Sequence, residues 1–310
     1  MKTTTPDNLV IISNRASADL ARKVSESLDI PYTEVILKQF QDKEVYHAFP
    51  LKMAGRDVVI IGSTPDDTAH QEVIDLIDGS HYWRADSVNV IIPFLGYSTM
   101  ERAKSGSGEI PKGITRTRQI FRSNPTFVGF IDLHSEAVLH AHSGKIRTKH
   151  LQTDKLIVDK IKTIGNKDIV LVSPDYGRSK WVAGLASMLG LPHTAADKDR
   201  FDTDQTMVRQ VSSVVKGKTA IICDDMIRTG GSIIQTAERC LQAGALETMI
   251  MATHLVLCGD ARKRIQEAGI GRIIGSDTYP NVKSDSLLDV YSVAPLIAEE
   301  LIKLLGVKNL

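Results

Sequence analysis

The chain has 310 residues, of which 42% are hydrophobic and 24% charged, and 38 Lys and Arg balance 37 Asp and Glu. This composition excludes a disordered chain and predicts a globular protein of about two domains. The balanced charge argues against nucleic-acid or membrane partners, and no apolar run reaches the roughly 18 residues that cross a bilayer. Because no signal peptide is visible at the N-terminus, the sequence favours a cytoplasmic enzyme.

The first half of the chain alternates β-branched runs with helical periodicity. In chain order we predict strand 9–12, helix 16–28, strand 57–62, helix 68–78, strand 88–93 and strand 126–132. Strands that are apolar throughout and alternate with amphipathic helices predict a parallel sheet covered by helices.

The second half repeats this pattern. We predict helix 156–164, strand 168–172, helix 180–189, strand 218–223, helix 231–243, strand 247–256, helix 261–268, strand 272–275 and helix 296–305. The likeness of the halves predicts two tandem α/β domains, 1–148 and 149–310, with the last helix, 296–305, packing back on the N-terminal domain.

The three cysteines are Cys223, Cys240 and Cys258. Their spacing fits neither a zinc site nor a disulfide framework. Each lies in an apolar stretch, so we expect three buried thiols in a reducing compartment.

The segment 224–232 carries the strongest functional signal, because two carboxylates and a Thr-Gly-Gly-Ser turn lie between a buried strand and a helix. Glycines let backbone N–H groups approach phosphate oxygens, and a helix N-terminus favours an anion. The carboxylates are placed to bind ribose hydroxyls directly or through Mg²⁺. A plain strand-to-helix turn is the alternative, and the adjacent carboxylates disfavour it. The predicted ribose 5-phosphate site comprises Asp224, Asp225, Arg228, Thr229, Gly230, Gly231 and Ser232.

This segment resembles the phosphoribosyl-diphosphate loop of type I phosphoribosyltransferases and of ribose-phosphate diphosphokinases. The second family is the better match, because the resemblance extends over nearly the whole chain and two tandem α/β halves are typical of it. The resemblance implies two phosphoribosyltransferase-like domains, each a mainly parallel sheet flanked by helices. It also implies transfer of the β,γ-diphosphoryl group of ATP to the 1-hydroxyl of ribose 5-phosphate, giving 5-phosphoribosyl 1-diphosphate and AMP.

A segment near the N-terminus resembles the part of these enzymes that touches ATP from a neighbouring subunit. Here it reads Phe40-Gln41-Asp42-Lys43-Glu44. The resemblance implies that Phe40 stacks on adenine, that Asp42 and Glu44 accept from its amino group, and that Lys43 replaces a common glycine. On the residues alone, Phe40 is more typical of a core side chain.

His134 closes a strand in the sequence Ile-Asp-Leu-His. A single histidine in this position is usually structural. The resemblance gives it a role at the Mg²⁺ of MgATP, near the phosphates. The nearby His140 and His142 match no family site, and we expect both to be surface residues rather than metal ligands.

Two loops of the second half resemble the family's phosphate-binding loops. In the first, the resemblance implies that Asp175 holds a second metal or organises the ribose hydroxyls. It also implies that Gly177 lets the backbone approach the phosphates, and that Arg178 replaces a glycine. A plain Pro-Asp turn is the alternative. In the second, Lys198 and Arg200 match the Lys-x-Arg of the catalytic loop and are implied to neutralise the transferring phosphates. A charged, solvated loop is the alternative there.

The donor segment departs from the common diphosphokinase pattern. An Arg-Gln pair that contacts ATP is replaced here by Thr99 and Met100, followed by Arg102. The Thr-x-Glu-Arg pattern resembles the plant-type (class II) branch, which is less strict about its nucleotide donor and does not need phosphate for activity. The resemblance implies that these three residues line the ATP site, with relaxed donor use and weak allosteric control.

Arg228 also departs from the family pattern, where this residue is usually acidic or small. Its guanidinium could strengthen phosphate binding, or it could pair with Asp224 or Asp225 and close the site. Arg178 and Lys43, like Arg228, add positive charge, which suits a polyphosphate substrate but leaves full activity open.

The sequence leaves alternatives to the diphosphokinase. One is a non-catalytic regulatory homologue, which loss of the Arg-Gln pair favours and retention of Lys198, Arg200, His134 and Asp175 disfavours. Another is a phosphoribosyltransferase, which would need a base-recognition hood that the sequence does not show. The resemblance also implies a homo-oligomer, dimer or hexamer, with the ATP site at a subunit interface.

Overall fold

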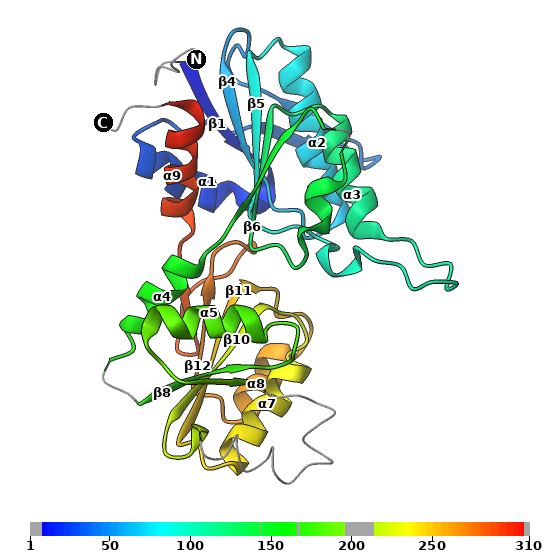
Figure 1. Ribbon diagram of the computed structural model, residues 1–310. Coiled ribbons are helices and arrows are strands. Elements are labelled where there is room, and N and C mark those ends of the chain that lie inside the picture. Colours follow the sequence, from blue (N-terminus) through cyan, green and yellow to red (C-terminus); the bar gives the residue numbers. More distant parts are fainter. Residues whose placement is uncertain (1–7, 143, 166–167, 196–213, 307–310) are drawn as a thin grey trace. The chain divides into compact units, whose positions relative to one another are not determined.

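The computed structural model describes residues 8–142, 144–165, 168–195 and 214–306 (Figure 1). Lys198 and Arg200, the predicted catalytic pair, lie outside the described residues. The chain divides into two compact units. Unit 1 comprises Met1–Gln152, Thr278–Asn281 and Ser292–Leu310, and unit 2 comprises Thr153–Asp277 and Val282–Tyr291.

Unit 1 is built on a five-stranded sheet in which all neighbouring strands are parallel. The strand order is β1 (Leu9–Ser13), β4 (Asp57–Ile61), β5 (Ser87–Ile92), β6 (Phe127–Ile131) and β7 (Arg147–Leu151). The first four are apolar and buried, because a parallel sheet covered on both faces needs apolar residues at successive positions. β7 is polar and lies at the sheet edge, so its sequence does not predict a strand.

Helices cover both faces of this sheet. On one face, α2 (Asp67–Tyr82) and α3 (Lys112–Arg122) pack over a core that includes Val58 and Ile60. The side chains of Val59 and Ile61 point to the other face, where α1 (Ala18–Leu28) packs against β1, β4 and the last helix, α9 (Ala294–Leu305) (Figure 1). The chain therefore returns to unit 1 after unit 2 is complete.

Two elements of unit 1 carry little sequence signal. An antiparallel hairpin of β2 (Ile36–Gln39) and β3 (Val45–Ala48) is exposed or half-buried, so it has no apolar run. The buried positions of α3 are Gly113, Thr117, Ile120 and Phe121. Because Gly113 and Thr117 are not hydrophobic side chains, the apolar side of this otherwise polar helix is short.

Unit 2 is a six-stranded parallel sheet. Its order is β13 (Leu288–Tyr291), β12 (Arg272–Ser276), β11 (Glu247–Leu255), β10 (Thr219–Ile227), β8 (Ile169–Ser173) and β9 (His193–Ala195). Alternate strand residues face α4 (Asp154–Lys162) and α5 (Ser179–Leu189) on one side, and α7 (Gly231–Gln242) and α8 (Ala261–Glu267) on the other. The predicted architecture of mainly parallel sheets flanked by helices is confirmed.

The prediction of three buried thiols is wrong for one of them. Cys223 and Cys240 are buried, but Cys258 is exposed. β11 ends at Leu255, so Cys258 lies in the loop before α8 rather than in the apolar strand that precedes it. Within the described ranges, no helix has both the length and the apolar character to cross a membrane.

Candidate functional site

Two predicted loops of unit 2 follow neighbouring strands and lie at the carboxyl ends of the sheet. β8 and β10 are parallel neighbours, with Val172 opposite Ile222, so their carboxyl ends lie at the same edge. β10 continues to Ile227, beyond the predicted end at residue 223, so Asp224 and Asp225 belong to the strand. Asp225 is buried and Asp224 is half-buried, which gives both carboxylates a fixed position on the sheet.

Arg178, in the loop after β8, reaches these carboxylates. Its Nη2 lies 2.6 Å from Asp225 Oδ2, and its Nε lies 3.9 Å from Asp224 Oδ1. Arg178 thus forms ion pairs with both carboxylates, which the sequence does not predict, and Arg228 is exposed. Arg178 therefore places a positive charge beside the predicted ribose-binding pair.

The carboxyl of Asp224 is held in its neutral form over an unusual range of pH. Burial, followed by the adjacent charge of Asp225 and a hydrogen bond with it, raises the pKa of Asp224 from 3.8 to about 8. The backbone N–H of Asp225 and the charge of Arg178 act in the opposite direction. Burial, with the charge of Asp224, also raises the pKa of the Cys223 thiol, so Cys223 stays protonated.

The raised pKa of Asp224 predicts that the fold loses stability as pH rises. Between 3.8 and about 8 the folded chain keeps a proton that the unfolded chain has released, so the free energy of unfolding falls across this window. We expect Asp224→Asn to flatten that decline when urea unfolding is compared at pH 5 and pH 8. The control is Asp260→Asn, an exposed carboxylate of the same unit, which should keep the wild-type slope. Equal slopes for wild type and Asp224→Asn would contradict the prediction.

The loop after β8 is shaped by its own acidic residue. Asp175 Oδ1 accepts the backbone N–H of Arg178 at 3.0 Å, and Ser173 Oγ donates to the Asp175 carbonyl at 2.6 Å. These contacts are those of the Pro-Asp turn considered above, but the same turn directs Arg178 toward β10. A Cβ on Gly177 would lie 3.3 Å from Asp175 Oδ1, so the turn is tight.

The two glycines after β10 are required for different reasons. Gly230 precedes α7 with a φ of +76°, and an added Cβ would lie 3.1 Å from Ile265 Cδ1. Gly231 begins α7 without a positive φ, and its nearest neighbour for an added Cβ is Thr229 Oγ1 at 4.0 Å. The fold therefore needs glycine at 230 but has room for a side chain at 231, where a ligand on the helix N-terminus would come close. Thr229 and Ser232 are exposed beside it.

The predicted adenine segment of unit 1 forms the turn of the β2–β3 hairpin. Phe40 and Glu44 close the turn through a backbone hydrogen bond of 2.8 Å, and Asp42 Oδ1 accepts the N–H of Glu44 at 3.0 Å. Phe40 is 52% exposed, with its ring 6.4 Å from that of Tyr46 in an edge-to-face arrangement. Phe40 is therefore not a core residue, and about half of it is accessible to a ligand.

Lys43 adopts a backbone conformation that favours glycine, with a φ of +75°. We expect Lys43→Gly to stabilise the hairpin by about 1 kcal/mol, because a left-handed conformation costs a side chain roughly that much. Slower hydrogen exchange of the β2–β3 amides would show the gain. Lys43→Ala removes the charge but keeps the strain, so a similar gain in that variant would contradict the strain explanation.

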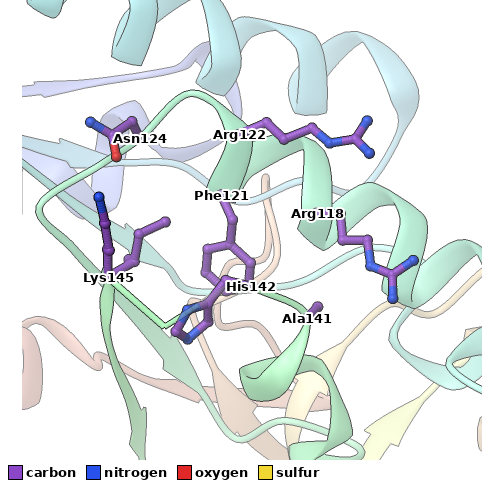
Figure 2. Close-up of a pocket in the computed structure, with 8 residues that line it drawn as sticks. Arg118, Phe121, Arg122, Asn124, Ala141, His142 and Lys145 are labelled. Carbon is purple, nitrogen blue, oxygen red and sulfur yellow. The ribbon is translucent and has the colours of Figure 1, made fainter.

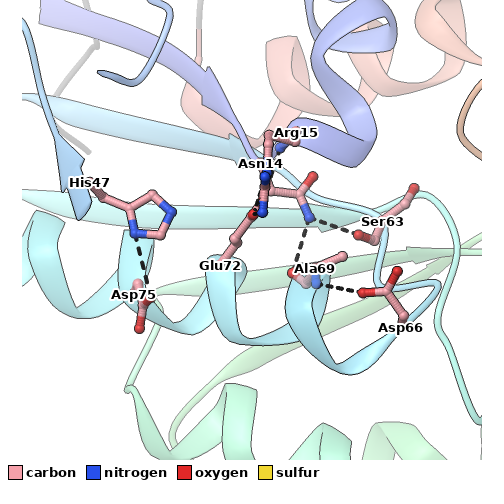
Figure 3. Close-up of polar contacts among 8 residues, drawn as sticks. All are labelled: Asn14, Arg15, His47, Ser63, Asp66, Ala69, Glu72 and Asp75. Carbon is pink, nitrogen blue, oxygen red and sulfur yellow. Dashed lines mark hydrogen bonds and ion pairs between the residues drawn. The ribbon is translucent and has the colours of Figure 1, made fainter. Parts of the chain in front are cut away.

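Contacts with α2 anchor the hairpin and the end of β1 (Figure 3). His47 of β3 pairs through Nδ1 with Asp75 Oδ2 of α2 at 3.5 Å. Asn14 Nδ2 donates to the carbonyls of Ser63 and Ala69 at 2.8 and 3.1 Å.

Arg15 joins the same cluster, since its Nε donates to the buried Glu72 at 2.6 Å (Figure 3). Asn14 and Arg15 match no motif. The sequence signal that could have identified them is their position directly after a buried strand, because ligands of parallel sheets bind beyond the carboxyl ends of the strands.

The remaining predicted residues of unit 1 lie after β5 and β6. Thr99 and Met100 belong to a short 3₁₀ helix, Ser98–Met100, and Arg102 follows with its side chain 81% exposed. Tyr97, just before them, lies under the cations of Lys112 and Arg116, at 4.9 and 5.8 Å from its ring centre.

His134 is exposed beyond the end of β6. Asp132, which precedes it by two residues, has a φ of +39°. Such strained backbone is common at functional sites.

Two protein-family models match this chain. The family model for the N-terminal domain of ribose phosphate pyrophosphokinase matches residues 9–113, and the phosphoribosyl transferase domain model matches residues 146–268. The ribose-phosphate pyrophosphokinase of Rhodopirellula baltica is 34% identical over 301 residues, covering 94% of this chain and 93% of that protein. The chain belongs to the ribose-phosphate pyrophosphokinase family.

Two further relatives support the assignment to this family. The ribose-phosphate pyrophosphokinase of Bacillus cereus is 31% identical, with 96% of this chain and 94% of that protein covered. The crystal structure of phosphoribosylpyrophosphate synthetase from Mycobacterium smegmatis matches with a TM-score of 0.85 at 26% identity, covering 96% of this chain and 99% of that chain. The pyrophosphokinase family thus accounts for both units and their order.

The carboxylates of the unit 2 site suit Mg²⁺. Among the residues that the structure describes, no group of three or more His, Cys, Asp or Glu could hold a metal ion. A Mg²⁺ site usually takes only one or two protein carboxylates, with substrate oxygens and water completing it. Asp175, Asp224 and Asp225 are oxygen donors at one sheet edge, and the latter two share the guanidinium of Arg178. These carboxylate oxygens are therefore suitable ligands for Mg²⁺, and oxygens of the substrate and water would complete its coordination.

Proposed function

We propose that this family member catalyses the ribose-phosphate pyrophosphokinase reaction. The 1-hydroxyl oxygen of ribose 5-phosphate attacks the β-phosphorus of ATP, the bond from that phosphorus to the α,β-bridging oxygen breaks, and AMP leaves. The hydroxyl proton passes to solvent as 5-phosphoribosyl 1-diphosphate forms. The observation that carries this proposal is the 224–232 loop, in a chain that matches family members over more than nine-tenths of its length.

The acceptor half of the site lies in unit 2. Thr229, Gly230, Gly231, Ser232 and the exposed Arg228 bind the 5-phosphate at the start of α7, where N–H groups and the helix dipole favour an anion. Asp224 and Asp225 accept from the ribose hydroxyls. The Asp175–Arg178 turn receives the diphosphate, and Arg178 moves from carboxylates to phosphate oxygens as both compete for its guanidinium.

The donor half uses the hairpin and the segment after β5. Phe40 stacks on adenine, with Asp42 and Glu44 at its amino group and Lys43 beside the phosphates. Thr99, Met100 and Arg102 take the place of the family's Arg-Gln pair. Lys198 and Arg200 neutralise the transferring phosphates, because this reaction asks mainly for positioning and charge stabilisation. The exposure of Phe40 supports its role, since the residue is 52% exposed.

Mg²⁺ is the proposed metal. His134 would contact the ion bound with ATP, Asp175 would hold a second ion, and Asp224 and Asp225 are further carboxylates near the proposed ribose 5-phosphate site. When bound, it would neutralise charge on the phosphates of ATP. The pKa of Asp224 is raised in the free chain, so binding of a cation there should release a proton. Calorimetry with Mg²⁺ and ribose 5-phosphate in two buffers of different ionisation enthalpy would measure that release.

The donor segment supports a place near the plant-type branch, with relaxed donor use and little need for phosphate. Activity with several nucleoside triphosphates in phosphate-free buffer is the expected result. Strong inhibition by ADP together with an absolute phosphate requirement would contradict it. We also propose a homo-oligomer, a dimer or a hexamer, in which the hairpin of one subunit completes the ATP site of its neighbour.

Release of AMP from ATP and ribose 5-phosphate with Mg²⁺ tests the proposed activity. A non-catalytic homologue releases none, and the ion pairs of Arg178 with the ribose-binding carboxylates are the observation that favours this alternative. A phosphoribosyltransferase would consume 5-phosphoribosyl 1-diphosphate instead and release diphosphate with a base present. Formation of AMP in step with 5-phosphoribosyl 1-diphosphate is expected, and its absence in the purified full chain would overturn the proposal.

A further inference from the structure

The segment that carries His134 leaves β6 through a turn that is hydrogen-bonded to β7. The two strands are parallel, and their last paired residues are Ile131 and Leu151. The N–H of Asp132 still donates to the carbonyl of Leu151, at 3.1 Å. Because Asp132 has a φ of +39°, the backbone turns there and the regular pairing of the strands ends.

The side chain of His150, in β7, provides the next hydrogen bond after this pairing ends. The backbone N–H of Leu133 donates to His150 Nε2 at 2.9 Å. Leu133 is a buried residue, so an N–H without an acceptor is unfavourable there. His150 therefore fixes the peptide group that directly precedes His134.

Glu136 orients the imidazole of His150 from its other nitrogen. His150 Nδ1 lies 2.8 Å from Glu136 Oε1. Since Nε2 accepts the N–H of Leu133, the proton of the neutral ring lies on Nδ1 and is donated to the carboxylate. The side chain of His150 is only 15% exposed. The carboxylate thus holds the ring in the tautomer that can accept from the backbone.

Glu136 is itself exposed, but the segment that carries it is packed on α3. Glu136 begins the 3₁₀ helix Glu136–His140, in which Val138 is buried in the same hydrophobic core as residues of α3. Two residues after this helix, the ring of His142 packs against Phe121 of α3, with centroids 4.9 Å apart (Figure 2). The hydrogen bonds from Glu136 to Leu133 therefore connect two fixed parts of unit 1, β7 and the segment on α3.

We propose that His150 and Glu136 are positioning residues for His134 in the binding of MgATP. This role rests on the proposed function, in which His134 contacts the ion bound with ATP. The exposed His134 follows a peptide group that these two residues hold in place. A side chain on a fixed backbone loses less conformational freedom on binding than one on a mobile backbone. Neither residue belongs to a motif that the sequence predicts.

Calorimetry with MgATP, without ribose 5-phosphate, tests this proposal on the full chain. His150→Leu removes the acceptor and should raise the Kd for MgATP by about tenfold. It should also speed hydrogen exchange at the Leu133 amide. His150→Gln should stay within about threefold of the wild-type Kd, because the side-chain oxygen of Gln can accept the same N–H. The Kd for ribose 5-phosphate should be unchanged in both variants.

Glu136→Ala gives a second test that does not alter a buried side chain, because Glu136 is exposed. Its Kd for MgATP should rise by about threefold, since the ring of His150 then loses its charge-assisted partner.

His81→Leu is the matched control. His81 Nε2 contacts a backbone carbonyl of the same unit, that of Asn124, at 3.0 Å, and His81 belongs to α2. This variant should bind MgATP as the wild type does. An equal loss in His81→Leu, or an equal loss in His150→Gln and His150→Leu, would overturn the positioning role. Weaker binding of ribose 5-phosphate in His150→Leu, to the same degree as MgATP, would show a general loss of structure and overturn it too.

The positioning role and the proposed function fail in different measurements. Absence of AMP release by the wild-type chain would overturn the proposed function. Normal AMP release by the wild type, with equal MgATP affinity in wild type, His150→Leu and Glu136→Ala, would overturn only the positioning role.

Discussion

Gly231→Ala is expected to leave the fold intact and to raise the KM for ribose 5-phosphate by about 10- to 100-fold. Gly231 has an ordinary φ, and an added Cβ would meet nothing nearer than Thr229 Oγ1 at 4.0 Å. The protein itself therefore does not need glycine there, and alanine is a better helix former. A bound 5-phosphate would meet the new methyl group and lose one or more charge-assisted hydrogen bonds, each worth roughly 1.5–3 kcal/mol.

Gly230→Ala is the matched control for this prediction. Its φ of +76° and the 3.1 Å approach of Ile265 Cδ1 mean that a side chain strains the turn before α7. We expect a loss of about 1–2 kcal/mol in the free energy of unfolding, measured by urea denaturation. The two variants should therefore separate stability from binding. Normal ribose 5-phosphate binding in a correctly folded Gly231→Ala chain would show that the loop does not hold the phosphate as proposed.

Lys198→Ala is expected to lower kcat by about 10²-fold or more, with ribose 5-phosphate binding little changed. Lys198 lies outside the described residues, so the prediction depends on the match of the 197–200 segment to the family's catalytic loop. A cation that stabilises charge only in the transition state affects turnover more than ground-state binding.

Initial rates of AMP release and calorimetric binding of ribose 5-phosphate separate the two effects of Lys198→Ala. Lys216→Ala is the control, because Lys216 is an exposed lysine of the same unit. Near-normal turnover in Lys198→Ala would remove Lys198 from the catalytic machinery. A parallel loss in Lys216→Ala would mean that the measurement reports the net charge of the protein instead.

Local sequence determined the buried framework of this protein. The apolar runs of β1, β4, β5 and β6 are sufficient to predict strands, because a parallel strand is covered on both faces. The 224–232 loop was predictable for a similar reason, since adjacent carboxylates, glycines and a helix start all lie within one short segment. The resemblance of that loop to one family then extended the prediction from a ribose-phosphate site to a reaction.

Only the tertiary structure decided which side chains meet. Asp225 and Arg178 are far apart in the sequence, and their 2.6 Å ion pair depends on β8 and β10 being neighbours in the sheet. The raised pKa of Asp224 likewise comes from burial near the end of a strand that the local sequence pattern ended four residues too early. Hydrophobic periodicity records how each segment is buried, whereas contacts between distant segments depend on strand order and on where each strand stops.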